Sequence, residues 1–152
     1  MKLRDHNMRK TYTALLLASI CASTTIISPQ VKAVDGLSAN AAFTSNYLWR
    51  GLEQTNGSSA VSGGIDYSAK SGFYAGTWAS NIDFGGSDDT NIEWDAYLGK
   101  YYQLNDKIGL DVGIAYYTYH GDDASDTYNY PEAYTKFGYS SSLGDTELNF
   151  WY

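Results

Sequence analysis

The chain has 152 residues, a length that suits one domain, and a formal net charge of −7. Four of its ten basic residues fall within the first ten positions, so the rest of the chain is more acidic still. This balance argues against nucleic acid as a partner and against electrostatic binding to anionic lipid surfaces.

Residues 1–33 are predicted to be a secretory signal peptide, with a basic start, a short apolar run and the small-x-small end Val31-Lys32-Ala33. The apolar run is too short and too interrupted for a spanning helix. Cys21 is the only cysteine, and Ile20 precedes it where a lipoprotein signal needs a small residue. The mature chain then has no cysteine, which excludes disulfides and thiolate metal sites.

After the signal, apolar and polar residues alternate with the period of β-strands, and fifteen glycines with only two prolines fit tight turns. Residues 108–119, IGLDVGIAYYTY, show the pattern most clearly, with one wholly apolar face. Asn56-Gly57 predicts a turn with positive φ angles. The predicted strands are residues 37–51, 60–68, 73–84, 91–102, 108–119 and 127–139, and a seventh that includes residues 148–152.

Alternation also predicts which side chains share a face. On the first strand the outward set is Leu37, Ala39, Ala41, Phe43, Tyr47 and Trp49. On the third strand Tyr74, Trp78, Ile82 and Phe84 are predicted outward, with Thr77, Asn81 and Asp83 opposite. Pro131 removes one ladder donor, so the sixth strand is expected to bulge or distort there.

Strand length favours a membrane barrel, because most of these strands reach or approach the roughly 9–11 residues that a tilted span needs. Aromatic residues gather near strand ends, as in the interfacial girdles of outer-membrane barrels. The predicted girdle is Tyr47, Trp49, Tyr74, Tyr101, Tyr102, Tyr116 and Tyr119. The fold predicted is an antiparallel transmembrane β-barrel, an up-and-down meander, with a secreted soluble β-sandwich as the alternative. Seven strands do not close such a barrel, so the sequence predicts a fragment of a longer protein or closure by another copy.

Charged residues on the inward positions predict an acidic lumen that favours cations and neutral polar solutes over anions. The predicted lining is Arg50, Asp66, Asp83, Glu93, Asp95, Asp111 and Glu132. The alternative is that these residues pair with one another and fill a narrow barrel. Two acidic loops, at residues 85–90 and 120–126, do not follow a calcium-loop spacing. No catalytic residues, metal ligands or cofactors are predicted.

Four stretches resemble the TorF family of proteobacterial porins: LSANAAFTSNYLWRGLEQ, GGIDYSAKSGFYAGTWASNIDF, DVGIAYYTY and YNYPEAYTKFGY. They cover most of the mature chain, and SNY-x-x-RG and SGFYAGTWASN are fairly specific. The resemblance implies an outer-membrane barrel of the diffusion-channel type and supplies no catalytic motif. The chain departs from the pattern by ending where relatives continue into further strands, which leaves barrel closure open.

Together these observations predict an outer-membrane channel of a Gram-negative bacterium for passive diffusion of small polar solutes. Its expected partners are outer-membrane lipid, lipopolysaccharide and the barrel-assembly machinery, with a homo-oligomer left open and nucleic acid excluded. The alternative is a non-conducting membrane or surface β-protein whose acidic loops bind a partner or an envelope component.

Overall fold

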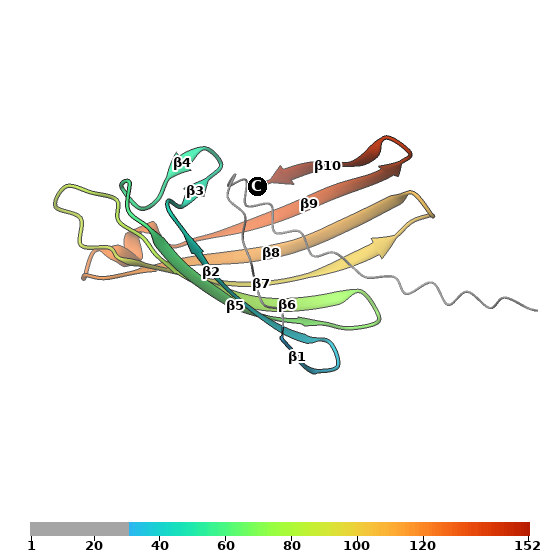
Figure 1. The fold of residues 1–152 in the computed structure, drawn as a ribbon, viewed down its shortest axis with the longest axis horizontal. Helices are drawn as coiled ribbons and strands as arrows, with labels where there is room; N and C mark the ends of the chain where they lie inside the picture. Colours follow the sequence, from blue (N-terminus) through green and yellow to red (C-terminus); the bar gives the residue numbers. More distant parts are fainter. Residues whose placement is uncertain (1–30) are drawn as a thin grey trace, which may run out of the picture.

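A computed structural model describes residues 31–152, which form one curled antiparallel sheet and a separate short hairpin (Figure 1). The strands are β1 (Val31–Val34), β2 (Leu37–Thr44), β3 (Leu48–Trp49), β4 (Leu52–Glu53), β5 (Ala60–Ser68), β6 (Phe73–Asn81), β7 (Ile92–Gln103), β8 (Ile108–His120), β9 (Tyr130–Ser141) and β10 (Gly144–Trp151). A 3-10 helix, η1 (Ser125–Tyr128), precedes β9.

The large sheet has the order β1-β2-β5-β6-β7-β8-β9-β10, so neighbouring strands follow one another along the chain. This meander confirms the predicted all-β antiparallel fold. The sheet curls into a half-barrel, and β1 and β10 lie at its two edges, each with one partner strand within residues 31–152 (Figure 1). The hairpin of β3 and β4 forms the second, two-stranded sheet.

Most of the predicted signal peptide, including Cys21, lies outside the described residues; its last three positions begin β1, which pairs with β2. In the described part of the chain, no helix combines the length and the apolar character needed to cross a membrane.

Strand bounds follow the sequence pattern closely where alternation is regular. β5 agrees with the prediction residue for residue, and β7 and β8 agree within one residue at each end. The first and third predicted strands end earlier, at Thr44 and Asn81, because the chain leaves the sheet there to build loops. β10 begins at Gly144, four residues before the first position predicted for the seventh strand.

The β3–β4 hairpin turns at Arg50 and Gly51, whose φ angles are +49° and +84°. Two successive positive φ angles define the type I′ turn that suits a two-residue hairpin loop. Arginine is uncommon in this conformation, so no hairpin was predicted at this point. Asn56 and Gly57 do adopt the predicted positive φ angles, +46° and +75°.

The predicted bulge at Pro131 is wrong, because the register between β8 and β9 runs unbroken through the Tyr116–Pro131 pair. Ala133, two residues later, exchanges both backbone hydrogen bonds with Tyr152 on the β10 side. The amide position of Pro131 therefore points the same way as that of Ala133, beyond the last residue of β10. Within residues 31–152 no acceptor lies opposite that amide position, and the register stays regular through Pro131.

The sheet has two chemically distinct faces. We call the face covered by the β3–β4 hairpin the inner face, and the opposite one the outer face. Large apolar side chains stand exposed along the outer face of the long strands. They are Phe43, Val61, Ile65, Tyr67, Phe73, Trp94, Leu98, Ile114, Tyr116, Phe137, Tyr139, Leu148 and Phe150. The buried side chains on the inner side include five tyrosines and the two acids Glu93 and Asp95, whereas the interior of a soluble protein seldom holds buried acids.

Candidate functional site

The connection from β2 to β5, residues 45–59, folds over the inner face and carries the hairpin. Its base is closed by Thr55, which is fully buried: its Oγ1 accepts a hydrogen bond from Tyr47 N at 3.1 Å and donates one to Asn46 Oδ1 at 2.8 Å. Gln54 N donates to Tyr47 O at 2.8 Å. Tyr47 meets Trp78 of β6 edge to face, with ring centroids 5.5 Å apart. The hairpin is therefore anchored to the sheet at its base.

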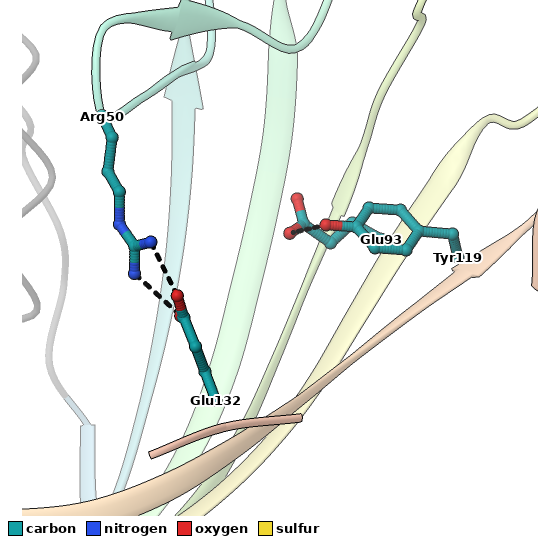
Figure 2. A network of polar contacts seen from close by, with 4 residues as sticks. All are labelled: Arg50, Glu93, Tyr119 and Glu132. Atoms are coloured by element: carbon teal, nitrogen blue, oxygen red, sulfur yellow. Dashed lines mark hydrogen bonds and ion pairs between the residues drawn. The ribbon is translucent and has the colours of Figure 1, made fainter. Parts of the chain in front are cut away.

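At the tip of the hairpin, Arg50 reaches across to β9 and donates two hydrogen bonds to Glu132, at 2.7 and 2.8 Å (Figure 2). Its guanidinium carbon lies 4.6 Å from the ring centroid of Trp49 and 4.5 Å from that of Trp151. The hydrogen bonds to Glu132 raise the pKa of Arg50, against the opposing effect of partial burial. Bidentate pairing combined with cation–π contact fixes the tip in place.

Glu93 and Asp95 of β7 lie on the inner face near the anchored base of this connection. Only 2% of Glu93 and 8% of Asp95 is exposed. Tyr119 of β8 donates a hydrogen bond from its hydroxyl to Glu93 Oε1 at 3.2 Å (Figure 2). Glu93 Oε2 and Asp95 Oδ1 have no hydrogen-bond partner among the described residues. This pair is the least satisfied charged group of the described inner face.

Two other inner-face acids, Asp111 and Asp66, are held by tyrosines. Tyr74 donates from its hydroxyl to Asp111 Oδ1 at 2.7 Å, and the Tyr134 hydroxyl lies 2.5 Å from that of Tyr74. Tyr97 donates to Asp66 Oδ1. Neutral donors thus solvate these carboxylates in place of water.

Of the predicted lumen-lining residues, six lie on the inner face or project onto it from the hairpin: Arg50, Asp66, Glu93, Asp95, Asp111 and Glu132. Asp83 follows the end of β6, where its Oδ1 accepts a hydrogen bond from Gly85 N at 2.8 Å. Asp83 therefore stabilises a turn instead of standing in line with the other acids.

The predicted girdle is only partly on the outer face. Tyr102 and Tyr116 are exposed on the outer face, as expected. Tyr101, at the end of β7, lies on the inner face by register and donates a hydrogen bond from its hydroxyl to Gln103. Four residues of the predicted girdle lie on the inner side: Tyr47, Trp49, Tyr74 and Tyr119; the predicted outward face is wrong for the first three.

The error on β6 extends to the whole strand, because Tyr74, Trp78 and Ile82 face inward and Thr77 and Asn81 face outward. The polar outward side chains bond to nearby groups: Thr77 donates to Asp95 O at 2.7 Å, and Asn81 Oδ1 accepts from Val61 N at 2.7 Å. Local bonding of this kind lets a hydroxyl or amide stand on an apolar face.

Inner-face glycines accommodate the tyrosine rings, a relation that was not predicted from the sequence. The register pairs Gly99 with Tyr74, Gly76 with Tyr97 and Gly113 with Tyr134. A Cβ atom at each of these glycines would collide with the paired ring. The sequence feature that could have predicted this packing is that glycine and tyrosine recur at the inward positions of adjacent strands.

The acidic loops at one end of the sheet are tied to each other. Thr90 and Ser125 are buried and their hydroxyls lie 2.8 Å apart, and Tyr128 donates a hydrogen bond to Asp88 Oδ2 at 2.5 Å. The bond from Tyr128, with those from Thr90, lowers the pKa of Asp88. Among residues 31–152, no three histidine, cysteine or acidic side chains group in a way that suits a metal ion.

The fold and site together define a curled antiparallel β-meander with an apolar outer face and a tyrosine-lined, acidic inner face crossed by a hairpin. Residues 31–151 match the model of a family described as a bacterial protein of unknown function (Gcw_chp), and the chain belongs to that family. No curated protein and no solved structure matches the chain. The family carries no assigned activity, so the resemblance to the TorF porins stays a prediction.

Proposed function

We propose that this chain forms wall strands of an outer-membrane β-barrel of a Gram-negative bacterium, of the porin-like kind its sequence resembles, and that small polar solutes diffuse along its inner face. The observation that carries the proposal is the reversed distribution of side chains, apolar on the outer face and acidic on the inner one. A monomeric soluble protein rarely leaves so extended an apolar surface in water.

Strand dimensions support the same proposal. The long strands β5 to β9 have 9 to 13 residues, which matches the roughly 9–11 residues that a tilted strand needs to cross a bilayer. Near one end of β7, Lys100 turns outward with its Nζ 4.6 Å from the ring of Phe73 and 4.8 Å from that of Tyr102. A lysine over aromatic rings suits the membrane–water interface, where its amine reaches the headgroups.

The inner face would select by charge. Seven acids share that face with Arg50 and Lys136: Asp66, Glu93, Asp95, Asp111, Glu132, Asp145 and Glu147. An excess of carboxylates along a pore favours cations over anions. In lipid the open edges of the half-barrel need partners, so closure requires further strands from the same polypeptide or from another copy.

A second candidate is a non-conducting outer-membrane β-protein whose acidic loops bind a partner. The Arg50–Glu132 contact favours it, because the hairpin then lies across the inner face and occupies space that solutes would need. The two acidic loops, joined through Thr90 and Ser125, would present a fixed surface at one end of the sheet.

Membrane fractionation followed by conductance measurement tests both candidates. The full chain, expressed in a Gram-negative host, is expected in the outer-membrane fraction and to need detergent for extraction. In planar bilayers the channel proposal predicts stepwise currents that prefer cations. In a salt gradient, the triple variant E93Q/D95N/D111N should move the reversal potential toward zero, which means a weaker preference for cations. Outer-membrane location without currents would favour the second candidate, and recovery as a soluble protein would contradict both.

A further inference from the structure

Two buried carboxylate oxygens on the inner face make no hydrogen bond of normal geometry, although the Tyr47 hydroxyl lies near Glu93. Glu93 Oε2 and Asp95 Oδ1 are buried without a hydrogen-bond partner in the described part of the chain, and neither carboxylate takes part in an ion pair there. The two residues alternate on β7, so their side chains project side by side from the same face. Each is more than nine-tenths buried.

Glu93 and Asp95 are the only acids among residues 31–152 with a buried oxygen that has no hydrogen bond; Glu93 accepts one bond at Oε1, from Tyr119. Asp66, Asp111 and Glu132 receive hydrogen bonds from Tyr97, Tyr74 and Arg50. Two adjacent carboxylates removed from water repel each other, and leaving their acceptors unfilled adds a desolvation penalty. A bound cation with hydrogen-bond donors would relieve both effects.

Aromatic rings enclose the two carboxylates. The register sets Asp95 between Trp78 of β6 and Tyr117 of β8, and it sets Glu93 beside Tyr119 of β8. Tyr47 covers Trp78 from the hairpin connection. Electron-rich ring faces beside carboxylates attract organic cations.

The donor set suits an ammonium group better than a metal ion. Calcium takes six to eight oxygen ligands, and magnesium demands six in near-ideal octahedral geometry. Within residues 31–152 no third histidine, cysteine or acidic side chain joins this pair. A primary ammonium carries three N–H donors, two of which match the two free oxygens.

The chain already contains a contact of this chemical type. The Arg50 guanidinium contacts the rings of both Trp49 and Trp151 and is paired with the carboxylate of Glu132. Aromatic contacts connect that place with the acid pair, from Trp49 to Tyr117 at 6.1 Å and from Tyr117 to Tyr130 at 4.7 Å, and on to Tyr119 at 6.5 Å. These ring contacts connect the Arg50 contact with the place where Glu93 and Asp95 lie.

We propose that Glu93 and Asp95 bind the primary ammonium group of a small organic cation on the inner face. This inference rests on the proposed function, because it names the class of solute that the acidic inner face of the channel would bind.

Calorimetric titration of the full chain in non-ionic detergent tests the site, with n-butylammonium chloride as probe and n-butanol and calcium chloride as comparison ligands. We expect saturable binding of butylammonium and none of butanol. E93Q and D95N should each weaken binding at least 10-fold, whereas E147Q and D89N, which remove exposed acids by the same chemical changes, should not. Tryptophan fluorescence of each variant checks that the fold is kept.

Absence of saturable butylammonium binding to the unaltered chain would overturn the inference, whatever the variants do. Equal binding of butanol, displacement of butylammonium by calcium at lower concentration, or unchanged affinity in E93Q and D95N would overturn it as well. Conductance in planar bilayers is recorded separately. Currents without butylammonium binding would reject the ammonium site and support the channel. Binding without currents would support the ammonium site and reject the channel.

Discussion

Arg50 donates two hydrogen bonds to Glu132, a residue 82 positions later in the chain. This contact joins the tip of the β3–β4 hairpin to β9, and the guanidinium also contacts the rings of Trp49 and Trp151. Because the base of the hairpin is anchored through the buried Thr55, the connection is fixed at both ends over the inner face. The ion pair between Arg50 and Glu132 therefore holds the hairpin tip over the inner face, where the tip takes up space that a solute would need.

Removing either partner of this pair should loosen the hairpin. In a double-mutant cycle of R50A and E132A, we expect a coupling free energy of about 1 kcal/mol, since the arginine is partly exposed and solvent screens the pair. Denaturant unfolding in detergent micelles, followed by tryptophan fluorescence, measures it. The Lys70–Asp35 pair, 3.8 Å apart and almost fully exposed, is the control and should show no measurable coupling. Additive effects of R50A and E132A would show that the ion pair between Arg50 and Glu132 does not hold the hairpin tip.

Gly99 should not tolerate a side chain. A Cβ there would strike the ring of Tyr74 and lie 2.8 Å from Val112 O, so G99A should lower the free energy of unfolding by about 1–3 kcal/mol. A Cβ added at Gly138 of β9 would meet no atom within 4 Å, so G138A should change stability by less than about 0.5 kcal/mol. Equal stability of G99A and G138A would show that Tyr74 does not lie over Gly99.

The loop contact between Tyr128 and Asp88 should be visible by titration. The phenol donates to Asp88 Oδ2, so the pKa of Asp88 is lower in the folded chain than in the unfolded one. The stability that the contact contributes is complete above the unfolded pKa, near 3.9, and is lost as pH falls through the lower folded pKa. In Y128F the pKa of Asp88 should rise toward its ordinary value, as measured by carboxyl carbon NMR. Y116F, on the outer face, should leave it in place, and an unchanged pKa in Y128F would contradict the contact.

A charge on the outer face should hinder membrane insertion. Leu98 and Ile114 lie opposite each other on β7 and β8, well inside both strands. L98R is expected to cost about 2–4 kcal/mol if this position lies near the bilayer midplane. The expected readout is loss of the protein from the outer-membrane fraction. L143R, in the exposed turn before β10, is the control and should fractionate as the unaltered chain does. Normal membrane recovery of L98R would argue that the outer face does not meet lipid.

Strand existence could be predicted from sequence, and face assignment could be predicted only in part. On β7 and β8 the alternation of Trp94 and Leu98 with Glu93 and Asp95 separates apolar from charged residues, and both bounds and faces agree with the structure. On β6 the alternating residues are Tyr74 and Trp78 against Thr77 and Asn81. Tyrosine and tryptophan carry an apolar ring and a polar donor, so they give little information on which face they occupy.

The site's long-range contacts could not be predicted. Alternation along the strands places Asp111 and Glu132 correctly on the inner face. Nothing in the neighbouring sequence indicates that Tyr74 donates to Asp111 or that Arg50 donates to Glu132. Both contacts depend on how strongly the sheet curls and on where residues 45–59 fold. Sequence periodicity along single strands contains neither quantity.

Lipid quenching of single tryptophans tests most directly whether the outer face meets the bilayer. Two versions of the full chain are compared, one that keeps only Trp94 on the outer face and one that keeps only Trp78 on the inner face, with the other tryptophans changed to phenylalanine. In vesicles of brominated phospholipid, a lipid-facing outer face predicts strong quenching of Trp94 and little quenching of Trp78. Equal quenching of both, or none of Trp94, would contradict it.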